Sequence, residues 1–254
     1  MSRKKLSFVA SRADDAGDAF ELLSKEYGNV SVEEADVIVA LGGDGLMLET
    51  LHSTQHLSTP VYGMNRGSVG FLMNEFTDKC LFSRLDEAEE AVIHPLKMTA
   101  QCVDGSIETS LAINEVSLIR HGPQAAKLRI SVDGRERLSE LVCDGALLST
   151  PAGSTAYNYS AHGPILPIGA EILALTAMAA FRPRRWRGAL LPMSANVKFD
   201  VLEPEKRPVT AVADGKEAIH VLSVEICNEP NVSHRIFFDP GHGLEERLIR
   251  EQFV

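Results

Sequence analysis

The pattern of apolar and polar positions changes near residue 95. Before that point, short apolar runs alternate with stretches in which apolar residues recur every three or four positions, as in alternating strands and helices. We expect strands at 6–10, 36–41 and 60–64, helices at 16–27 and 46–52, and an acidic amphipathic helix at 78–93. This alternation predicts an N-terminal α/β domain, residues 1–95, with a largely parallel, Rossmann-like sheet.

Beyond residue 95 the apolar positions alternate with a period of two, which is typical of half-buried strands. The segments with this period are 97–103, 107–119, 127–132, 196–202 and 220–226. Asp-Gly pairs at Asp104, Asp133 and Asp214 have the chemistry of tight hairpin turns. Residues 170–180 fit a helix by composition and a strand by position. Residues 96–230 are therefore expected to form a β-rich, antiparallel second domain.

Composition and charge exclude several classes of protein. Apolar residues make up 44% and charged residues 24% of the 254 residues, which is ordinary for a folded globular chain. No signal-peptide core and no membrane-spanning apolar stretch is present, so we expect a cytoplasmic protein with no membrane partner. The net charge of −10 argues against nucleic-acid binding. The four cysteines contain no CxxC pair, so no zinc ribbon or disulfide framework is indicated.

A glycine-rich turn joins the second predicted strand to the helix that follows it. The turn reads Gly42-Gly43-Asp44-Gly45, and hairpin chemistry does not explain it because its flanks are a strand and a helix. Such a turn lets a phosphate or ribose approach the backbone, and Asp44 could accept a hydrogen bond or a proton from a sugar hydroxyl. The alternative is that Asp44 only caps the helix. Neither the Walker phosphate loop nor the dinucleotide fingerprint GxGxxG occurs.

Two further segments combine polar groups with apolar surroundings. Residues 144–160 run from a predicted strand into Thr-Pro-x-Gly-Ser-Thr, which places hydroxyls and backbone amides at an expected helix start. Asn114 and Glu115 interrupt an apolar strand, and two adjacent polar residues cannot both point to the solvated face. One of them is therefore expected to face the core or a cleft. An ordinary capped helix and a strand end turning into a loop are the structural alternatives.

Together these segments resemble the NAD kinase family in order and spacing across nearly the whole chain. The resemblance rests on Gly42–Gly45, on Asn114-Glu115, and on two longer motifs, Gly63-Met64-Asn65-x-Gly67-x-x-Gly70-Phe71-Leu72 and Asp144-Gly145…Thr150-Pro151-x-Gly153-Ser154-Thr155-Ala156-Tyr157. It implies an α/β N-terminal domain completed by residues 231–254 and a β-rich domain that holds much of the NAD site. The implied reaction transfers a phosphoryl group from ATP or polyphosphate to the 2′-OH of the adenosine ribose of NAD, giving NADP.

The resemblance also assigns roles to individual residues. Asp44 corresponds to the aspartate that contacts the ribose hydroxyls and is the proposed general base, and Asn114 and Glu115 to the pair that binds ribose hydroxyls and adenine. Asp144 corresponds to an aspartate that reaches the ligand of a neighbouring subunit, which implies a homo-oligomer. The remaining pocket residues are Gly45, Phe71, Thr155, Ala156, Tyr157 and Ser160, followed by Gly43, Asn65, Arg66 and His220.

Two departures from the commoner family pattern concern the phosphoryl donor. Leu46 stands where many members have threonine, so a hydroxyl that could hold phosphate is missing. A basic segment containing Arg182, Arg184, Arg185 and Arg187 replaces a less basic region, and it is either a solvated loop or a contact for donor phosphates or an acidic partner surface.

A divalent cation, normally Mg²⁺, is expected on the donor phosphates rather than in a dedicated protein site, since Mg²⁺ keeps several waters and needs few carboxylates. A lipid kinase that shares the glycine-aspartate turn and a non-catalytic NAD-binding protein are the two alternative functions.

Overall fold

The structure, a computed structural model of the 254-residue chain, describes residues 3–66 and 71–241. Two predicted segments lie outside the described residues. They are residues 67–70, which belong to the glycine-rich motif 63–72, and residues 242–254, the end of the expected C-terminal extension. The chain divides into two units: residues up to Ile93 with those from Val232 onward, and His94–Asn231.

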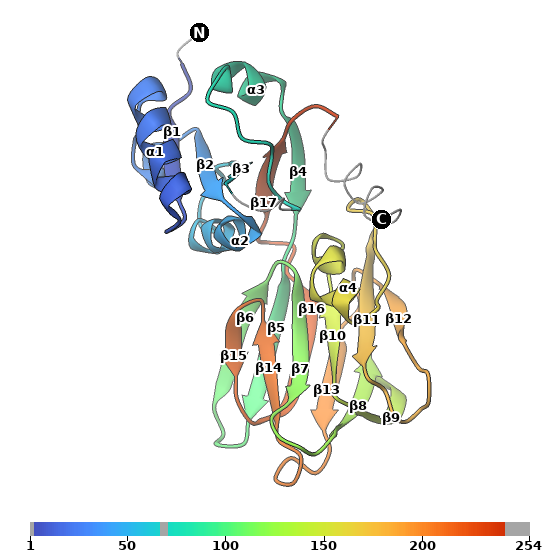
Figure 1. The fold of residues 1–254 in the computed structure, drawn as a ribbon. Coiled ribbons are helices and arrows are strands. Elements are labelled where there is room, and N and C mark those ends of the chain that lie inside the picture. The colour runs from blue at the N-terminus through green and yellow to red at the C-terminus, as the bar shows by residue number, and fades with distance from the viewer. Residues whose placement is uncertain (1–2, 67–70, 242–254) are drawn as a thin grey trace. The chain divides into compact units, whose positions relative to one another are not determined.

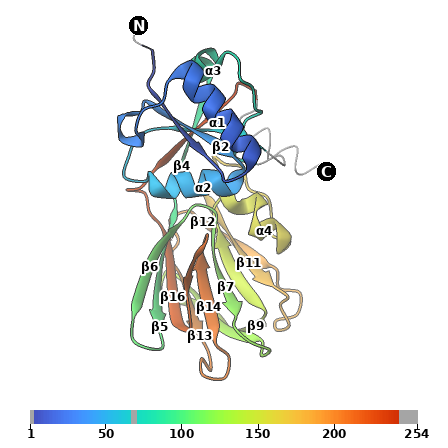
Figure 2. The same cartoon turned by 60° about the vertical axis from the view of Figure 1, so that its left-hand side comes forward.

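A five-stranded sheet forms unit 1, in the order β1-β2-β3-β17-β4 (Figure 1). The first four of these strands run parallel: β1 (Leu6–Ala10), β2 (Val37–Gly42), β3 (Val61–Asn65) and β17 (His234–Phe238). The edge strand β4 (Glu89–Ile93) is antiparallel to β17. Helix α1 (Asp14–Tyr27) packs on β1 and β2, and α2 (Asp44–Ser53) packs on β2 and β3 (Figure 2). The short helices η1 (Val32–Glu34) and α3 (Leu81–Glu87) lie in the connections.

The predicted acidic helix at 78–93 is wrong in extent. The helical period is real only over α3, where Leu81 and Leu85 are buried. Ala88 is extended, with φ −61° and ψ 139°, and the chain then enters β4. Because β4 pairs along its whole length with β17, the last strand of the described chain, tertiary pairing overrides the local helical pattern.

Unit 2 consists of two six-stranded sheets in which every pairing is antiparallel. The first contains β12 (Gly188–Pro192), β11 (Ile172–Met178), β10 (Gly145–Ser149), β7 (Glu115–Arg120), β14 (Val209–Ala213) and β15 (Lys216–Ala218). The second contains β6 (Ile107–Ala112), β5 (Leu96–Cys102), β16 (Val221–Asn228), β13 (Val197–Val201), β8 (Ala126–Val132) and β9 (Arg135–Cys143). After β10 the chain forms η2 (Ala152–Thr155) and α4 (Tyr157–Ser160).

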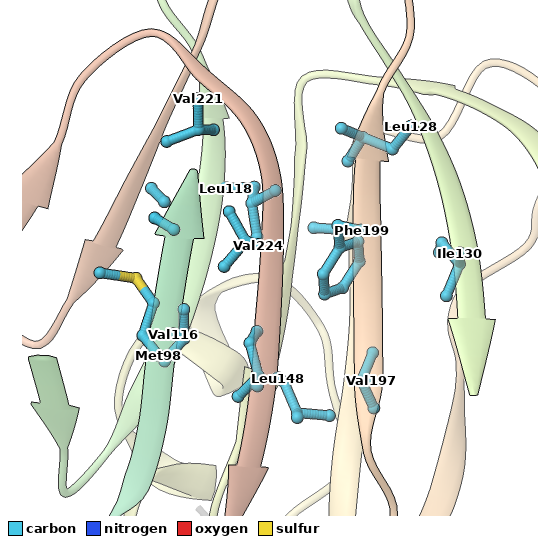
Figure 3. Close-up of a cluster of buried hydrophobic side chains, with 14 of the residues drawn as sticks. Met98, Val116, Leu118, Leu128, Ile130, Leu148, Val197, Phe199, Val221 and Val224 are labelled. Carbon is cyan, nitrogen blue, oxygen red and sulfur yellow. The ribbon is translucent and has the colours of Figure 1, made fainter. Parts of the chain in front are cut away.

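Apolar side chains from both sheets of unit 2 form one core. Val116 and Leu148 come from the first sheet, and Met98, Phe199 and Val224 come from the second (Figure 3). Buried and half-buried residues alternate along β8 and β13, as the period of two predicts. The α/β plus antiparallel β fold class is thereby confirmed.

The structure decides the one ambiguous segment of unit 2 and divides another predicted segment in two. Residues 170–180, which fitted a helix or a strand, contain the strand β11, because its five central residues are buried between β10 and β12. The stretch 107–119, predicted as one alternating segment, contains two strands, β6 and β7, with a bend at residues 113–114. Asn114 therefore lies in the bend, and Glu115 begins β7.

Candidate active-site residues

The glycine-rich turn of unit 1 lies where β2 ends and α2 begins, as the sequence predicts. A Cβ atom on Gly42 would lie 2.8 Å from the Cδ2 atom of Leu46, so this glycine permits close packing of the strand end on the helix. A Cβ atom on Gly43 or Gly45 would have no neighbour within 4 Å among the described atoms. The backbone at these two glycines is therefore open to a ligand at the start of α2.

The Asp44 carboxylate does not cap the helix it begins. Its Oδ2 atom accepts a hydrogen bond from the Phe71 backbone N–H at 2.6 Å, and its Oδ1 atom accepts one from Leu72 N–H at 2.8 Å. Gly43 is the N-cap residue of α2, and no side chain caps that position. The Asp44 carboxylate thus holds residues 71–72, the end of the glycine-rich motif 63–72, against the turn at residues 42–45. The predicted site residue Phe71 therefore lies beside Asp44.

Asn65 ends β3 and Arg66 follows it at the same sheet edge, because the carboxyl ends of parallel strands meet there. Asn65 is opposite Gly42 in the register of the two strands, and Arg66 N–H donates to the Gly42 carbonyl at 2.8 Å. The Arg66 guanidinium donates to the Asp15 carbonyl at 3.0 Å and lies 4.2 Å from the centre of the Phe76 ring. Asn65 and Arg66 therefore adjoin the glycine turn, and the Arg66 head group is engaged by its neighbours.

In unit 2, the backbone around Asn114 and Glu115 is held from two directions. The Asp214 carboxylate accepts hydrogen bonds from the N–H groups of Ile113, Asn114 and Glu115, at 2.7, 3.0 and 3.4 Å. From the other side, the Thr150 hydroxyl donates to the Ile113 carbonyl at 2.7 Å, and Thr150 N–H donates to the Asn114 carbonyl at 2.9 Å. The backbone bonds are thus satisfied without using either side chain of the Asn114-Glu115 pair.

Those two side chains keep unused hydrogen-bonding capacity. Oε2 of Glu115 is inaccessible and has no hydrogen-bond partner among the described residues. The same carboxylate accepts a bond from the backbone N–H of Tyr157. Burial, reinforced by the nearby charge of Asp214, raises the pKa of Glu115 to about 7. A buried acceptor without a partner is unusual in a native fold, and it points to a ligand that supplies the missing donor.

In the loop from β10 to α4, some polar side chains are buried and others are exposed. The hydroxyls of Ser149, Thr150 and Ser154 are buried and bonded to backbone carbonyls, so the hydroxyls expected at an open helix start are internal instead. The helical segments are also short, with four residues in each of η2 and α4. Of the four predicted site residues here, Thr155 and Ala156 are half-buried, and Tyr157 and Ser160 are exposed.

Asn158, which the sequence did not single out, fixes this loop. It is fully buried, and its Nδ2 atom donates to the Ser154 and Pro164 carbonyls at 3.1 and 2.9 Å. Its Oδ1 atom accepts from the Thr176 hydroxyl at 2.7 Å. The only hint in the sequence is its place between two tyrosines, which does not distinguish a buried amide from an exposed one.

Asp144 and His220 lie at the other end of β7 from Glu115. Asp144 forms an ion pair with Arg120 at 2.7 Å, and Arg120 is the last residue of β7. The His220 ring packs edge-on against His121, with 5.2 Å between the ring centres. Five residue steps along a strand amount to roughly 17 Å. The structure therefore does not bring Asp144 or His220 to the Glu115 end of their own unit.

The basic segment contains four arginines within six residues. Among the described residues, none of Arg182, Arg184, Arg185 and Arg187 has a carboxylate within 4.0 Å. Arg187 and His162 line a pocket of about 410 Å³, and Trp186 between the arginines packs against the core. Both the solvated-loop interpretation and the anion-contact interpretation remain compatible with this placement.

Known proteins match the chain over its whole length. The model of the ATP-NAD kinase N-terminal domain matches residues 11–93, and that of the ATP-NAD kinase C-terminal domain matches residues 113–228. An NAD kinase of Cereibacter sphaeroides is 64% identical over 254 residues, covering 100% of both chains. One of Caulobacter vibrioides is 58% identical over 249 residues, covering 98% of this chain and 96% of the relative.

Solved structures share the fold. Yeast NADH kinase complexed with NADH has a TM-score of 0.82 at 21% identity, covering 98% of this chain and 87% of that one. An NAD kinase from Archaeoglobus fulgidus in complex with ATP has a TM-score of 0.75 at 24% identity, covering 98% and 97%. The two domain models and the full-length relatives agree with the motifs located above, and the chain belongs to the NAD kinase family.

Proposed function

We propose that the chain transfers the terminal phosphoryl group of ATP to the 2′-hydroxyl of the adenosine ribose of NAD, giving NADP. As a member of the family it is an enzyme, an ATP-dependent NAD kinase. Its match to both domain models argues against a lipid kinase that shares only the glycine-aspartate turn.

The observation that carries the substrate assignment is the unpartnered Oε2 atom of Glu115. An adenosine group offers ribose hydroxyls and an exocyclic amine, which are the donors this oxygen lacks. Asn114 adds a side-chain amide that can both donate and accept, and it has no hydrogen-bond partner among the described residues. The adjacent Thr155, Ala156 and Tyr157 would complete the surface on which the adenosine rests.

Asp44 would act on the reacting hydroxyl. Phosphoryl transfer depends mainly on positioning and charge stabilisation, so a base contributes by accepting the hydroxyl proton as the new bond forms. The two amide bonds from Phe71 and Leu72 each occupy one lone pair of an Asp44 oxygen, which leaves acceptor capacity on both oxygens. The open backbone at Gly43 and Gly45 would let phosphate or ribose approach the start of α2.

Mg²⁺ would accompany the phosphoryl donor. The described residues contain no group of three or more His, Cys, Asp or Glu side chains placed to hold a metal ion. A cation held by the donor phosphates and water would neutralise charge on the donor during transfer. Polyphosphate is a second candidate donor, since Leu46 lacks a hydroxyl that could help hold phosphate.

The proposal also includes a homo-oligomeric assembly and a cytoplasmic location. Asp144 would serve the NAD site of a neighbouring subunit, which requires a homo-oligomer. The cytoplasmic location rests on the sequence. Among the described residues, no helix combines the length and apolarity needed to cross a membrane.

Calorimetry at pH 8 with NAD and with nicotinamide mononucleotide, which lacks the adenosine, tests the substrate assignment. The protein is expected to bind NAD and not the mononucleotide. Glu115→Gln should bind NAD about tenfold more weakly or worse, because Tyr157 N–H would hold the amide oxygen and leave an NH₂ group where the ligand needs an acceptor.

Glu217→Gln, an exposed change on β15, is the matched control and should bind NAD like the unmodified protein. Equal NAD affinity in Glu115→Gln and the unmodified protein would refute the assigned role. NAD binding without any formation of NADP would instead favour a non-catalytic NAD-binding protein.

A further inference from the structure

Asp214 occupies an Asp-Gly hairpin turn like two others in unit 2, but its carboxylate accepts a different set of hydrogen bonds. Asp104 bonds to Ser106, two residues away in its own turn. Asp133 accepts one bond, from Asn196 N–H at 3.0 Å, at an exposed position. Asp214 instead reaches a bend 100 residues away in sequence and accepts three backbone N–H groups there.

The bend needs such an acceptor. β6 pairs with β5 as far as Ala112, whereas β7 begins at Glu115, so the N–H groups between them have no neighbouring strand to bond. One carboxylate with two oxygens can serve several converging N–H groups at once, and a charged acceptor makes stronger bonds than a neutral one. Asp214 N–H also donates to the Glu115 carbonyl at 3.2 Å, which locks the two segments in both directions.

The Asp214 backbone is suited to this position. Its φ angle is 50°, in the left-handed region that Asn and Asp tolerate better than most residues with a side chain. Thr150 holds the opposite side of the bend, so the backbone is clamped between two residues that are not part of the ligand-facing pair. Only the side chains of Asn114 and Glu115 are left to meet a ligand.

We propose that Asp214 is the positioning residue of the Asn114-Glu115 pair, and that it sets the affinity of the enzyme for the adenosine part of NAD by fixing the backbone from which both side chains project. The inference rests on the proposed function. Among the described residues, the Asp214 carboxylate and the Tyr157 N–H act on the Glu115 carboxylate. The negative charge of Asp214 adds to burial in raising the pKa of Glu115, so Asp214 also influences how that residue is protonated near neutral pH.

The test compares Asp214→Asn with Asp133→Asn, the same change in a turn that has no link to the pair. Asparagine keeps the left-handed turn and one acceptor oxygen, but it loses the charge and the second acceptor. We expect Asp214→Asn to raise the KM for NAD about tenfold or more and to leave the KM for ATP within about twofold. The pH midpoint of NAD binding should move to lower pH, because a like charge near Glu115 is removed. Asp133→Asn should change none of these.

Hydrogen exchange of the amides of residues 113–115 provides a readout that does not depend on catalysis. These amides should exchange faster in Asp214→Asn and at the unmodified rate in Asp133→Asn. An unchanged KM for NAD would overturn the proposal. An equal rise in the KM for NAD and the KM for ATP, with no shift in the pH midpoint of NAD binding, would also overturn it. If the unmodified protein binds no NAD, the proposed function fails, and unchanged exchange at residues 113–115 would separately refute the clamp.

Discussion

A Cβ atom built on Gly153 would lie 2.3 Å from the backbone carbonyl oxygen of Asn114. The carbonyl carbon and Cα atom of Asn114 are equally close, at 2.4 and 2.5 Å, so no flexible side chain can move aside. The first turn of η2 is thus packed directly on the backbone of Asn114. A residue that looks like an ordinary loop glycine in the sequence determines how two distant segments meet.

Gly153→Ala is therefore expected to displace either η2 or the bend at Asn114. Overpacking against backbone should lower the free energy of unfolding by about 1–3 kcal/mol and should weaken NAD binding. Urea unfolding and calorimetry measure the two effects. Gly122→Ala is the control, since a Cβ atom there meets nothing within 4 Å among the described atoms. Unchanged stability and NAD affinity in Gly153→Ala would contradict the packing described.

Stability should depend on pH through Glu115. Its pKa in the folded chain is about 7, against an ordinary value of 4.5, so the folded state takes up a proton between these values. The stabilising effect of that proton is fully present below pH 4.5 and is lost as pH rises through 7. Glu115→Gln, which resembles the protonated acid, should gain about 1–3 kcal/mol over the unmodified protein at pH 8 and nothing near pH 4.5.

Urea unfolding at both pH values measures this difference, with Glu217→Gln as the exposed control. A parallel pH dependence in the unmodified protein and Glu115→Gln would show that folding does not raise the pKa of Glu115, contrary to this account.

The distance of Asp144 from Glu115 along β7 leads to a prediction about assembly. If Asp144 serves a neighbouring subunit, Asp44→Asn and Asp144→Asn chains should each have low activity alone and regain part of it when mixed. Sedimentation of labelled chains verifies that subunits have exchanged. The Arg120–Asp144 pair is partly exposed, so losing it should cost less than about 1 kcal/mol of stability. Verified exchange without recovered activity would argue for sites completed within single chains.

Strands such as β8 and β13 could be predicted because each has one buried face, which gives the sequence a period of two. The strand β4 could not, since Glu89–Ile93 fits a helix or a strand and is decided by pairing with β17, far away in the chain. The same limit applies to the site. Asp44, Asn114 and Glu115 are predicted as site residues by their motifs, but the sequence does not predict their hydrogen-bond partners.

Asp214 shows the reason most clearly. Its Asp-Gly dipeptide is identical to those at Asp104 and Asp133, and all three predict a tight turn. Which carboxylate reaches the bend at residues 113–115 depends on how the hairpins pack, and the local sequence does not determine that packing. Asn158 is a second case, because its burial follows from the close approach of Gly163, whose Cβ would lie 2.0 Å from the Asn158 Oδ1 atom.

The most direct test of the account is the formation of NADP by the purified protein incubated with NAD, Mg²⁺ and ATP, with polyphosphate in a parallel reaction and Asp44→Asn beside the unmodified protein. We expect NADP from the unmodified protein with ATP and a rate at least about 10²-fold lower for Asp44→Asn, the range a general base contributes. Thermal unfolding of the variant shows whether the loss of one amide acceptor for Phe71 or Leu72 has disturbed the fold. No NADP from either donor, or full turnover by a folded Asp44→Asn, would contradict the account.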